Sequence, residues 1–290
     1  MYAAGVMTMT VKDYLLLCWM AYLDLPPLYM ALIQRGGRIP VAALADSALR
    51  MDEAGVLGCV KLNAAARAAA REMLDSEAMI TGYINENDGD GFAAYIIEAG
   101  GETVIAMRGS ETRSECVASN VDWVDNVCEP FVGSVQLASI KRLADRFPEG
   151  SVTFTGHSKG GHNALAALAI SENPEARAVA FNGQGFGEAA LTAAQRARLH
   201  ERGVNYVVAD DVVGALLMQP ARRVFVRQAE GAQAHMPEAY VFDESGAPLI
   251  ARRTLKSRAI EAVTRLVEKR LGDGARGSIG RVCRAALGKS

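Results

Sequence analysis

Residues 152–170, VTFTGHSKGGHNALAALAI, decide the fold of this chain. A strand-like run comes first, a glycine-rich turn follows, and an alanine- and leucine-rich run of helical composition ends the stretch. The turn contains the pattern G-x-S-x-G, with Ser158 at its centre. Between a strand and a helix, this pattern is typical of a nucleophile elbow, in which flanking glycines let a strained turn close around a serine. The stretch therefore predicts an activated serine at the end of a buried strand.

Two simpler interpretations of this stretch compete with the elbow. An ordinary glycine-rich turn or a phosphate-binding loop would also place a serine between a strand and a helix. The phosphate-binding pattern G-x-x-x-x-G-K-[ST] is absent from the chain. The strand-like and helical flanks therefore favour the nucleophile elbow.

The same alternation of strand-like and helical runs extends to both sides of the turn. Short apolar runs of strand type recur at residues 103–107, 178–181, 204–208, 224–226 and 240–242. Helical patterns occur at residues 12–23, 63–77, 135–147, 188–202 and 255–271. Two further runs, 80–84 and 92–97, flank the turn-rich NENDGDG and predict a β-hairpin. The alternation predicts an α/β fold whose mainly parallel sheet is covered by helices on both faces.

Composition and charge bound the class of protein. Half of the 290 residues are hydrophobic and the net charge is −2, which favours a globular chain and argues against a nucleic-acid binder. The charge is uneven, because residues 251–290 carry 11 basic and 3 acidic side chains. We therefore predict one domain over residues 1–250, including N-terminal helices, and a basic helical extension over residues 251–290.

Cysteine usage and hydropathy suggest a compartment. The five cysteines are scattered without a C-x-x-C pair, which argues against a disulfide framework or a zinc site. The N-terminal region has no secretory pattern, and its apolar run at residues 14–23 is too short to cross a bilayer. These features predict a cytoplasmic protein that needs no metal and no organic cofactor.

Ser158 needs a general base, and the chain offers only four histidines. His157 is adjacent to the serine, so its side chain should point away. His162 belongs to the helix that leaves the elbow, and His200 lies near the end of a polar helix. By elimination, His235, in a loop between two strand-like runs, is the predicted base.

The remaining parts of a catalytic site can be placed by position. Asp210 and Asp211 both follow the run 204–208, and either can supply the carboxylate that orients the base. The order serine, aspartate, histidine is the order of α/β-hydrolases. The amide of Lys159, directly after the serine, and that of Ser110, after the run 103–107, are candidate oxyanion donors.

Several of these stretches together resemble a known family. GHSKGG at 156–161, MRGS at 107–110, DWVDN at 122–126 and DVVG at 211–214 are similar to the fungal-type (class 3) triacylglycerol lipases. They resemble most a bacterial branch whose members carry GHSKGG, as do residues 13–15, 22–24 and 181–186. The resemblance covers about residues 10–245 and implies an α/β-hydrolase fold. It implies Ser158, Asp211 and His235 as the triad, thereby selecting Asp211, and Ser110 as an oxyanion donor.

The chain departs from that family at two places. His162 stands where the bacterial branch more often has Asn, and the region of the lipase lid, residues 111–121, is polar here rather than amphipathic. The expected activity is hydrolysis of carboxylic esters through an acyl-enzyme, on a lipid or an equally suitable small soluble ester. The alternatives are a phospholipase recruited to anionic membranes by residues 251–290, and a catalytically silent module that binds a partner.

The basic C-terminal segment supports two interpretations. Ile260, Val263, Val267 and Leu271 form one apolar stripe, with Arg and Lys elsewhere. A final helix that packs on the domain with a solvated basic face is favoured, because the segment lacks Trp and Phe anchors. Weak contact between residues 251–290 and a membrane surface is the alternative.

Overall fold

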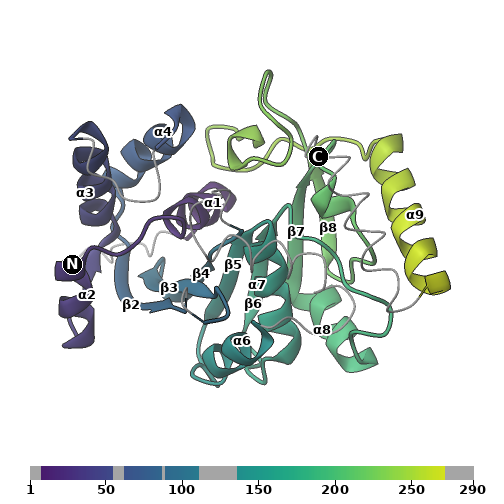
Figure 1. The fold of residues 1–290 in the computed structure, drawn as a ribbon, viewed down its shortest axis with the longest axis horizontal. Coiled ribbons are helices and arrows are strands. Elements are labelled where there is room, and N and C mark those ends of the chain that lie inside the picture. The colour runs from purple at the N-terminus through teal and green to yellow at the C-terminus, as the bar shows by residue number, and fades with distance from the viewer. Residues whose placement is uncertain (1–7, 55–61, 87–88, 111–135, 272–290) are drawn as a thin grey trace, which may run out of the picture.

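A computed structural model describes residues 8–54, 62–86, 89–110 and 136–271 of the chain. Within these ranges, eight strands form one sheet whose spatial order follows the chain order (Figure 1). The strands are β1 (Ile39–Pro40), β2 (Met79–Asn85), β3 (Ala93–Ala99), β4 (Glu102–Met107), β5 (Val152–His157), β6 (Arg177–Phe181), β7 (Gly203–Val208) and β8 (Arg222–Val226).

The sheet has an antiparallel and a parallel part, and β4 belongs to both. Strands β1 to β4 pair antiparallel, with β2 and β3 forming the predicted hairpin. Strands β4 to β8 pair parallel, so their carboxyl ends lie along one edge. In that register Met107 lies beside Gly156, and His157 lies beside Phe181. The loops that follow β4, β5, β6 and β7 therefore converge at the end of β5.

Helices cover both faces of the sheet, as predicted. They are α1 (Val11–Met20), α2 (Pro27–Gln34), α3 (Val41–Glu53), α4 (Ala64–Glu72), α6 (Leu137–Ala144), α7 (Lys159–Ile170), α8 (Ala193–Arg202) and α9 (Leu255–Leu271). Ile105 of β4 packs with Leu165 of α7 in one core cluster. Its neighbour Val104 packs with Leu17 of α1 in another. Because successive strand residues point to opposite faces, these two clusters lie on opposite sides of the sheet.

Local sequence signals explain where several helices begin. Asn63 caps α4 by accepting a hydrogen bond from the amide of Ala66 at 2.8 Å. The predicted helix 188–202 starts only at Ala193, because Thr192 caps it there through a capping box with Gln195. The sequence patterns predicted no separate ranges for helices α2 and α3, which lie within residues 27–53.

One predicted strand is wrong. Residues 240–242 make only isolated bridges, from Tyr240 to Gln228 and from Phe242 to Pro248. The turn Asp243–Ala247, closed by an amide-to-carbonyl bond of 2.9 Å, sends the chain back before a ladder can form. The sheet therefore ends at β8.

The described ranges contain no helix that combines the length and the apolar character needed to cross a membrane. Cys18 is the cysteine that they include, and it is buried and free. The lid region 111–121, the DWVDN stretch at 122–126 and the tail 272–290 lie outside the described residues. The division of the chain at residue 250 stays a prediction.

Candidate active site

Ser158 lies in the turn that joins β5 to α7. Its backbone adopts φ 59° and ψ −122°, a conformation that residues with a side chain rarely adopt. Such a residue costs about 1–3 kcal/mol and persists only where its surroundings hold it in place. The local structure around Ser158 is therefore the strained strand–turn–helix that the sequence pattern indicates.

The glycines on both sides of Ser158 let three chain segments approach one another. A Cβ atom on Gly156 would lie 2.2 Å from the carbonyl oxygen of Gly160. A Cβ atom on Gly160 would lie 2.2 Å from the carbonyl oxygen of Met107, the last residue of β4. Neither position has room for a side chain. The G-x-S-x-G spacing thus follows from the packing of α7 against β5 and β4.

His235 connects Ser158 with Asp211 through two hydrogen bonds. Its Nε2 lies 2.9 Å from Ser158 Oγ, and its Nδ1 lies 2.8 Å from Asp211 Oδ1. A carboxylate only accepts, so Nδ1 carries the proton and Nε2 is left to accept the hydroxyl proton of Ser158. The Asp211 side chain is fully shielded from solvent, and that of His235 is 19% exposed. The arrangement leaves a partly exposed hydroxyl at the end of a buried polar chain.

The loop after β7 orients Asp211. Its amide donates to the carbonyl of Val208 at 2.8 Å, and its Oδ2 accepts from the amide of Gly214 in η2 (Val213–Ala215) at 2.5 Å. One carboxylate oxygen is thereby held by the backbone while the other faces His235. Asp210 is exposed, and its carbonyl oxygen accepts from Lys256 Nζ at 3.2 Å. Of the two candidate aspartates, Asp211 is the one in contact with His235.

Two buried side chains hold the backbone of the His235 loop. The carbonyl oxygen of His235 accepts from His157 Nε2 at 2.7 Å and from Asn182 Nδ2 at 3.2 Å. Asn182, which follows β6 with φ 48°, also donates to the carbonyl of Ala234 and accepts from the amide of Val208. We call His157 and Asn182 the carbonyl clamp. Sequence reasoning assigned no role to either residue beyond the prediction that His157 points away from Ser158.

Burial keeps His157 of the clamp neutral. Desolvation first, and the nearby His235 second, lower the pKa of His157 to about 3. Because the carbonyl of His235 can only accept, the single proton of neutral His157 lies on Nε2. Its Nδ1 then faces the hydroxyl of Tyr22 at 3.3 Å. This histidine therefore acts as a fixed donor throughout the neutral pH range.

The segment Met107 to Ser110 leaves β4 beside the elbow. A Cβ atom on Gly109 would lie 2.1 Å from the hydroxyl oxygen of Tyr22 and 2.6 Å from the carbonyl of His157. Only glycine therefore fits between the N-terminal region and the end of β5. Ser110 follows directly and is half-buried, while Lys159 is the first residue of α7, with a buried side chain. Both predicted oxyanion donors thus stand in segments that border Ser158.

Arg108 ties this segment to the end of α1. Its buried guanidinium donates to the carbonyl of Ala21 at 2.7 Å and to Asp24 Oδ1 at 2.8 Å. It also donates to the hydroxyl of Tyr83 at 3.2 Å. The N-terminal residues 21–24 therefore form part of the support beneath the site.

The other two histidines lie away from Ser158 Oγ. His162 is buried in α7, where its Nδ1 is 3.3 Å from the carbonyl of Gln184 and its ring packs on Phe186 at 4.5 Å. His200 is exposed near the end of α8. The elimination that selected His235 is consistent with these positions.

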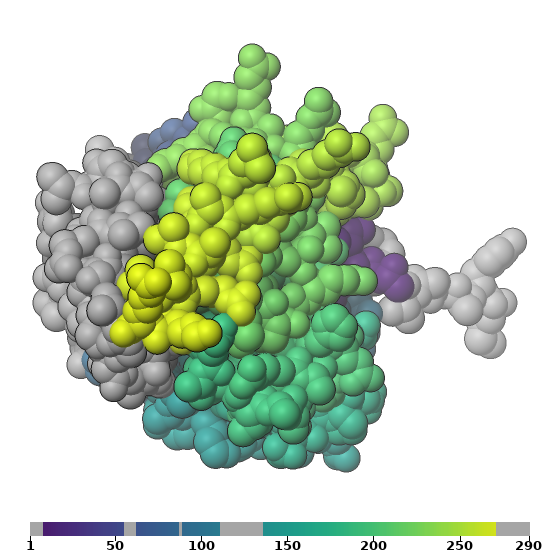
Figure 2. Space-filling model, turned by 90° about the vertical axis from the view of Figure 1, so that its right-hand side faces the viewer, coloured from purple at the N-terminus to yellow at the C-terminus, as the bar shows by residue number. Residues whose placement is uncertain are grey.

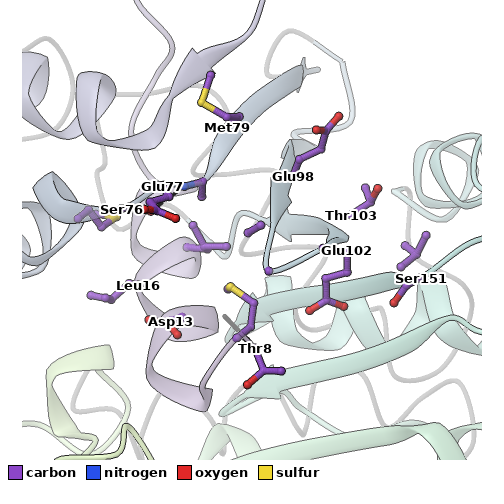
Figure 3. A pocket seen from close by; sticks show the side chains of 18 of the residues that line it. Thr8, Asp13, Leu16, Ser76, Glu77, Met79, Glu98, Glu102, Thr103 and Ser151 are labelled. Atoms are coloured by element: carbon purple, nitrogen blue, oxygen red, sulfur yellow. Dashed lines mark hydrogen bonds between the residues drawn. The ribbon is translucent and has the colours of Figure 1, made fainter. Parts of the chain in front are cut away.

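A separate hollow of about 880 Å³ lies at the opposite edge of the sheet (Figure 3). Its lining includes Thr103 and Val152 at the starts of β4 and β5, and the acidic side chains of Asp13, Glu77 and Glu98. It is therefore not a pocket for a substrate of Ser158. In the described ranges, no group of three or more His, Cys, Asp or Glu is arranged to hold a metal ion.

The sheet and the Ser158 turn together define an α/β-hydrolase type of fold. A family model, Mbeg1-like, matches residues 76–278. The chain therefore belongs to the Mbeg1-like family. No curated protein matches it.

Among solved structures, the chain is similar to several lipases and related proteins. A mutant of MDLA from Penicillium cyclopium shares 16% identity, with 82% of this chain and 90% of that chain covered and a TM-score of 0.47. A fungal lipase shares 12%, with 93% and 96% covered and a TM-score of 0.47. Lip2 lipase from Yarrowia lipolytica shares 10%, with 91% and 92% covered and a TM-score of 0.45. These are distant likenesses of fold.

Proposed function

We propose that this protein is a serine hydrolase that cleaves carboxylic esters through an acyl-enzyme. Ser158 is the nucleophile, His235 the general base and Asp211 the carboxylate that orients it. The observation that carries the proposal is the unbroken hydrogen-bonded chain from Ser158 Oγ through His235 to Asp211. The strained turn at Ser158 supports it further, because such strain is costly and gathers at functional sites.

Acylation follows from the positions of these three side chains. His235 Nε2 takes the hydroxyl proton of Ser158 as Oγ attacks the ester carbonyl carbon. Asp211 stabilises the imidazolium that forms and keeps its ring in place. The tetrahedral intermediate then collapses, the bond to the alcohol oxygen breaks, and His235 returns the proton to that leaving alcohol. The acyl group remains on Ser158.

Deacylation repeats the same steps with water. His235 takes a proton from a water molecule, whose oxygen attacks the acyl carbonyl carbon. The bond between that carbon and Ser158 Oγ then breaks, the carboxylic acid leaves, and His235 returns the proton to Oγ. During both steps the amides of Lys159 and Ser110 donate to the developing oxyanion. Lys159 opens α7, so the positive end of the helix dipole adds to this stabilisation.

The substrate class is an ester of a carboxylic acid, either a lipid or a small soluble ester. The lipase-like fold favours an acyl substrate. A catalytically silent binding module is the competing function, and the complete Ser–His–Asp chain argues against it.

The direct test is covalent labelling of the full-length protein with a fluorophosphonate, read by intact mass. We expect one adduct on wild type and none on Ser158→Ala. Ser151→Ala is the matched control, because Ser151 directly precedes β5 and so lies at the opposite end of that strand from Ser158. This variant should label like wild type.

Two results would contradict the proposal. A folded wild-type protein that gives no adduct and hydrolyses no ester of any chain length would favour the binding module. An adduct that persists on Ser158→Ala would place the reactive residue elsewhere. After positive labelling, a series of esters of increasing acyl length identifies the preferred substrate.

A further inference from the structure

Helix α9 lies on the side of the molecule with one face packed and one face open (Figures 1 and 2). Ile260 and Val267 pack against Leu216 and Leu217. Thr264 is 1% exposed, and its hydroxyl oxygen accepts from the amide of Leu217 at 3.0 Å. These contacts determine which side of the helix faces the protein.

The opposite side carries an apolar stripe. At about 100° per residue, the positions 255, 259, 262 and 266 fall within roughly 60° of arc, facing away from Thr264. Leu255 is 80% exposed and Leu266 48%, and Ala259 and Ala262 are exposed between them. Val263, also 48% exposed, widens the stripe on one side. The expected single stripe of residues 260, 263, 267 and 271 therefore divides, because Val263 turns outward, away from Ile260 and Val267. The side chain of residue 271 lies outside those that the structure describes.

Basic side chains line both edges of this stripe. The same helical spacing places Lys256 and Arg270 along one edge and Arg258 and Lys269 along the other, and all four are exposed. The acidic residues of α9 are on the packed side. Glu261 bonds Arg223 and Arg253, and Glu268 accepts from the amide of Glu188.

Among the residues that the structure describes, the two acidic side chains nearest the ends of this face add little negative charge to it. Glu188, at its border, is paired with Arg265 at 2.8 Å. Asp210 is exposed near the start of the helix, where Lys256 Nζ contacts its carbonyl oxygen. Among the described exposed residues of α9, every ionisable side chain is basic. The face is therefore a strip of apolar residues between two rows of cations.

We propose that this outer face of α9 docks on an anionic lipid surface. Leucine and valine side chains insert at the acyl boundary, while lysine and arginine extend toward the headgroups. Each cation near an anionic membrane contributes roughly 1 kcal/mol, a factor of about five in partitioning. Charge complementarity thus selects anionic lipid over neutral lipid.

Other occupants fit this face less well. A second copy would bring the basic rows of two helices together, and like charges at that distance repel. A nucleic acid would use the cations and leave Leu255 and Leu266 in water. A membrane surface with anionic headgroups over an apolar interior matches both the apolar stripe and the two basic rows of α9.

The position of α9 links this surface to the proposed site. The hydroxyl of Thr254, just before the helix, donates to the carbonyl of Ala209 at 3.0 Å, in the loop that leads to Asp211. Docking would therefore bring the proposed ester hydrolase to lipid esters. That last step rests on the proposed function, whereas the docking surface does not.

The test is cosedimentation of the full-length protein with two kinds of vesicle. One contains phosphatidylcholine alone, and the other contains phosphatidylcholine with phosphatidylglycerol. We expect wild type to pellet with the anionic vesicles and to remain largely in solution with the neutral ones. Leu255→Ser/Leu266→Ser should weaken partitioning roughly tenfold or more, because two apolar side chains no longer enter the interface.

A second variant tests the contribution of charge alone, because it removes two cations and leaves the apolar stripe intact. Arg258→Gln/Lys269→Gln should weaken binding by roughly 25-fold at low ionic strength, from a factor of about five per cation. The matched controls lie in α2, where Leu28 is 71% exposed, and directly after it, where Arg35 is also exposed. Leu28→Ser and Arg35→Gln should bind like wild type. Circular dichroism melts of all variants report folding.

Three outcomes would overturn the proposal. Wild type that does not bind anionic vesicles would exclude the surface, and α9 variants that bind like wild type would place the contact elsewhere. Sedimentation velocity that shows a wild-type dimer, lost in Leu255→Ser/Leu266→Ser, would assign the face to a second copy. Fluorophosphonate labelling of the same samples reports on Ser158 independently, so failure of docking and failure of the proposed function are distinguishable.

Discussion

The two ends of β5 both carry polar networks, but the networks differ in how they end. At the carboxyl end, the Ser158 hydroxyl remains half-buried at the tip of a chain that begins at Asp211. At the amino end, Glu102 accepts from the hydroxyls of Tyr14 and Thr153, one on each carboxylate oxygen. The first network ends in the hydroxyl that we propose as the nucleophile. We call the second network closed, because each carboxylate oxygen of Glu102 already accepts a hydrogen bond.

The difference follows from the direction of the parallel strands. Loops from β4, β6 and β7 and the amide end of α7 all meet at the carboxyl end of β5. At the amino end, the cluster joins α1 to the sheet. Burial, and then the bond to Glu102, raise the pKa of Tyr14 well above its ordinary value, so Tyr14 stays protonated. One strand thus supports a candidate site at one end and, at the other, a set of hydrogen bonds that holds α1 against the sheet.

The largest effect should come from Asp211 at the carboxyl end. Asp211→Asn removes the acceptor that holds the proton on His235 Nδ1, and we expect turnover of an ester to fall about 10⁴-fold with the fold retained. Steady-state hydrolysis measures it. Asp210→Asn is the control and should remain close to wild type, since Asp210 is exposed. Equal losses in the two variants would contradict the assignment.

A smaller effect should follow from His157 of the carbonyl clamp. His157→Leu removes one donor from the carbonyl of His235, and we expect kcat to fall about 10- to 100-fold through misplacement of the imidazole. His157→Gln retains an N–H donor and should recover part of that loss. If the Gln variant is as slow as the Leu variant, the donor has no positioning role.

The stability of wild type should also depend on pH through His157. Its pKa is about 3 in the folded protein and 6.5 in its ordinary state, so the unfolded chain binds the extra proton between these values. The contribution to stability is therefore fully present above pH 6.5 and is lost as the pH falls toward 3, by several kcal/mol. Urea unfolding at a series of pH values across this range measures the free energy of unfolding. That free energy should change less steeply with pH in His157→Gln than in wild type.

The smallest effect concerns the closed network at the amino end. Tyr14→Phe removes the hydrogen bond to Glu102, and we expect the free energy of unfolding to fall by about 1–3 kcal/mol while turnover stays unchanged. Tyr29→Phe is the control, because its hydroxyl makes only a long bond of 3.4 Å to the carbonyl of Ala43. A loss of turnover in Tyr14→Phe would mean that the two ends of β5 are coupled.

Local sequence was enough for the fold class, the family resemblance and the elbow. The α/β alternation is confirmed by a sheet with four parallel pairings and helices on both faces. The G-x-S-x-G turn needs glycines because neighbouring parts of the chain approach closely there, so the sequence pattern alone predicts the turn. The strand expected at residues 240–242 failed because strand composition does not determine whether a partner ladder is available.

Other parts of the site depended on the packing of distant segments. Asp210 and Asp211 are equivalent by position after the strand, and the family resemblance favoured Asp211. The path of the chain after β7 directs Asp211 toward His235, which is 24 residues away. Ser158 and His235 are 77 residues apart, and elimination among four histidines, not periodicity, suggested their contact. His157 and Asn182 lie in stretches that carry the family resemblance, but the sequence assigned neither of them the role of a clamp, because the carbonyl that they bind belongs to a distant loop.

The sequence by itself therefore determined which segments form strands and helices around Ser158, since periodicity and glycine spacing act between near neighbours. It determined the basic character of residues 251–290 in the same way. The family resemblance favoured Asp211, and tertiary structure brings that residue against His235. Only tertiary structure shows which buried groups hold the loop and which side of α9 faces outward. Those choices depend on the packing of segments far apart in the chain, and no local pattern records them.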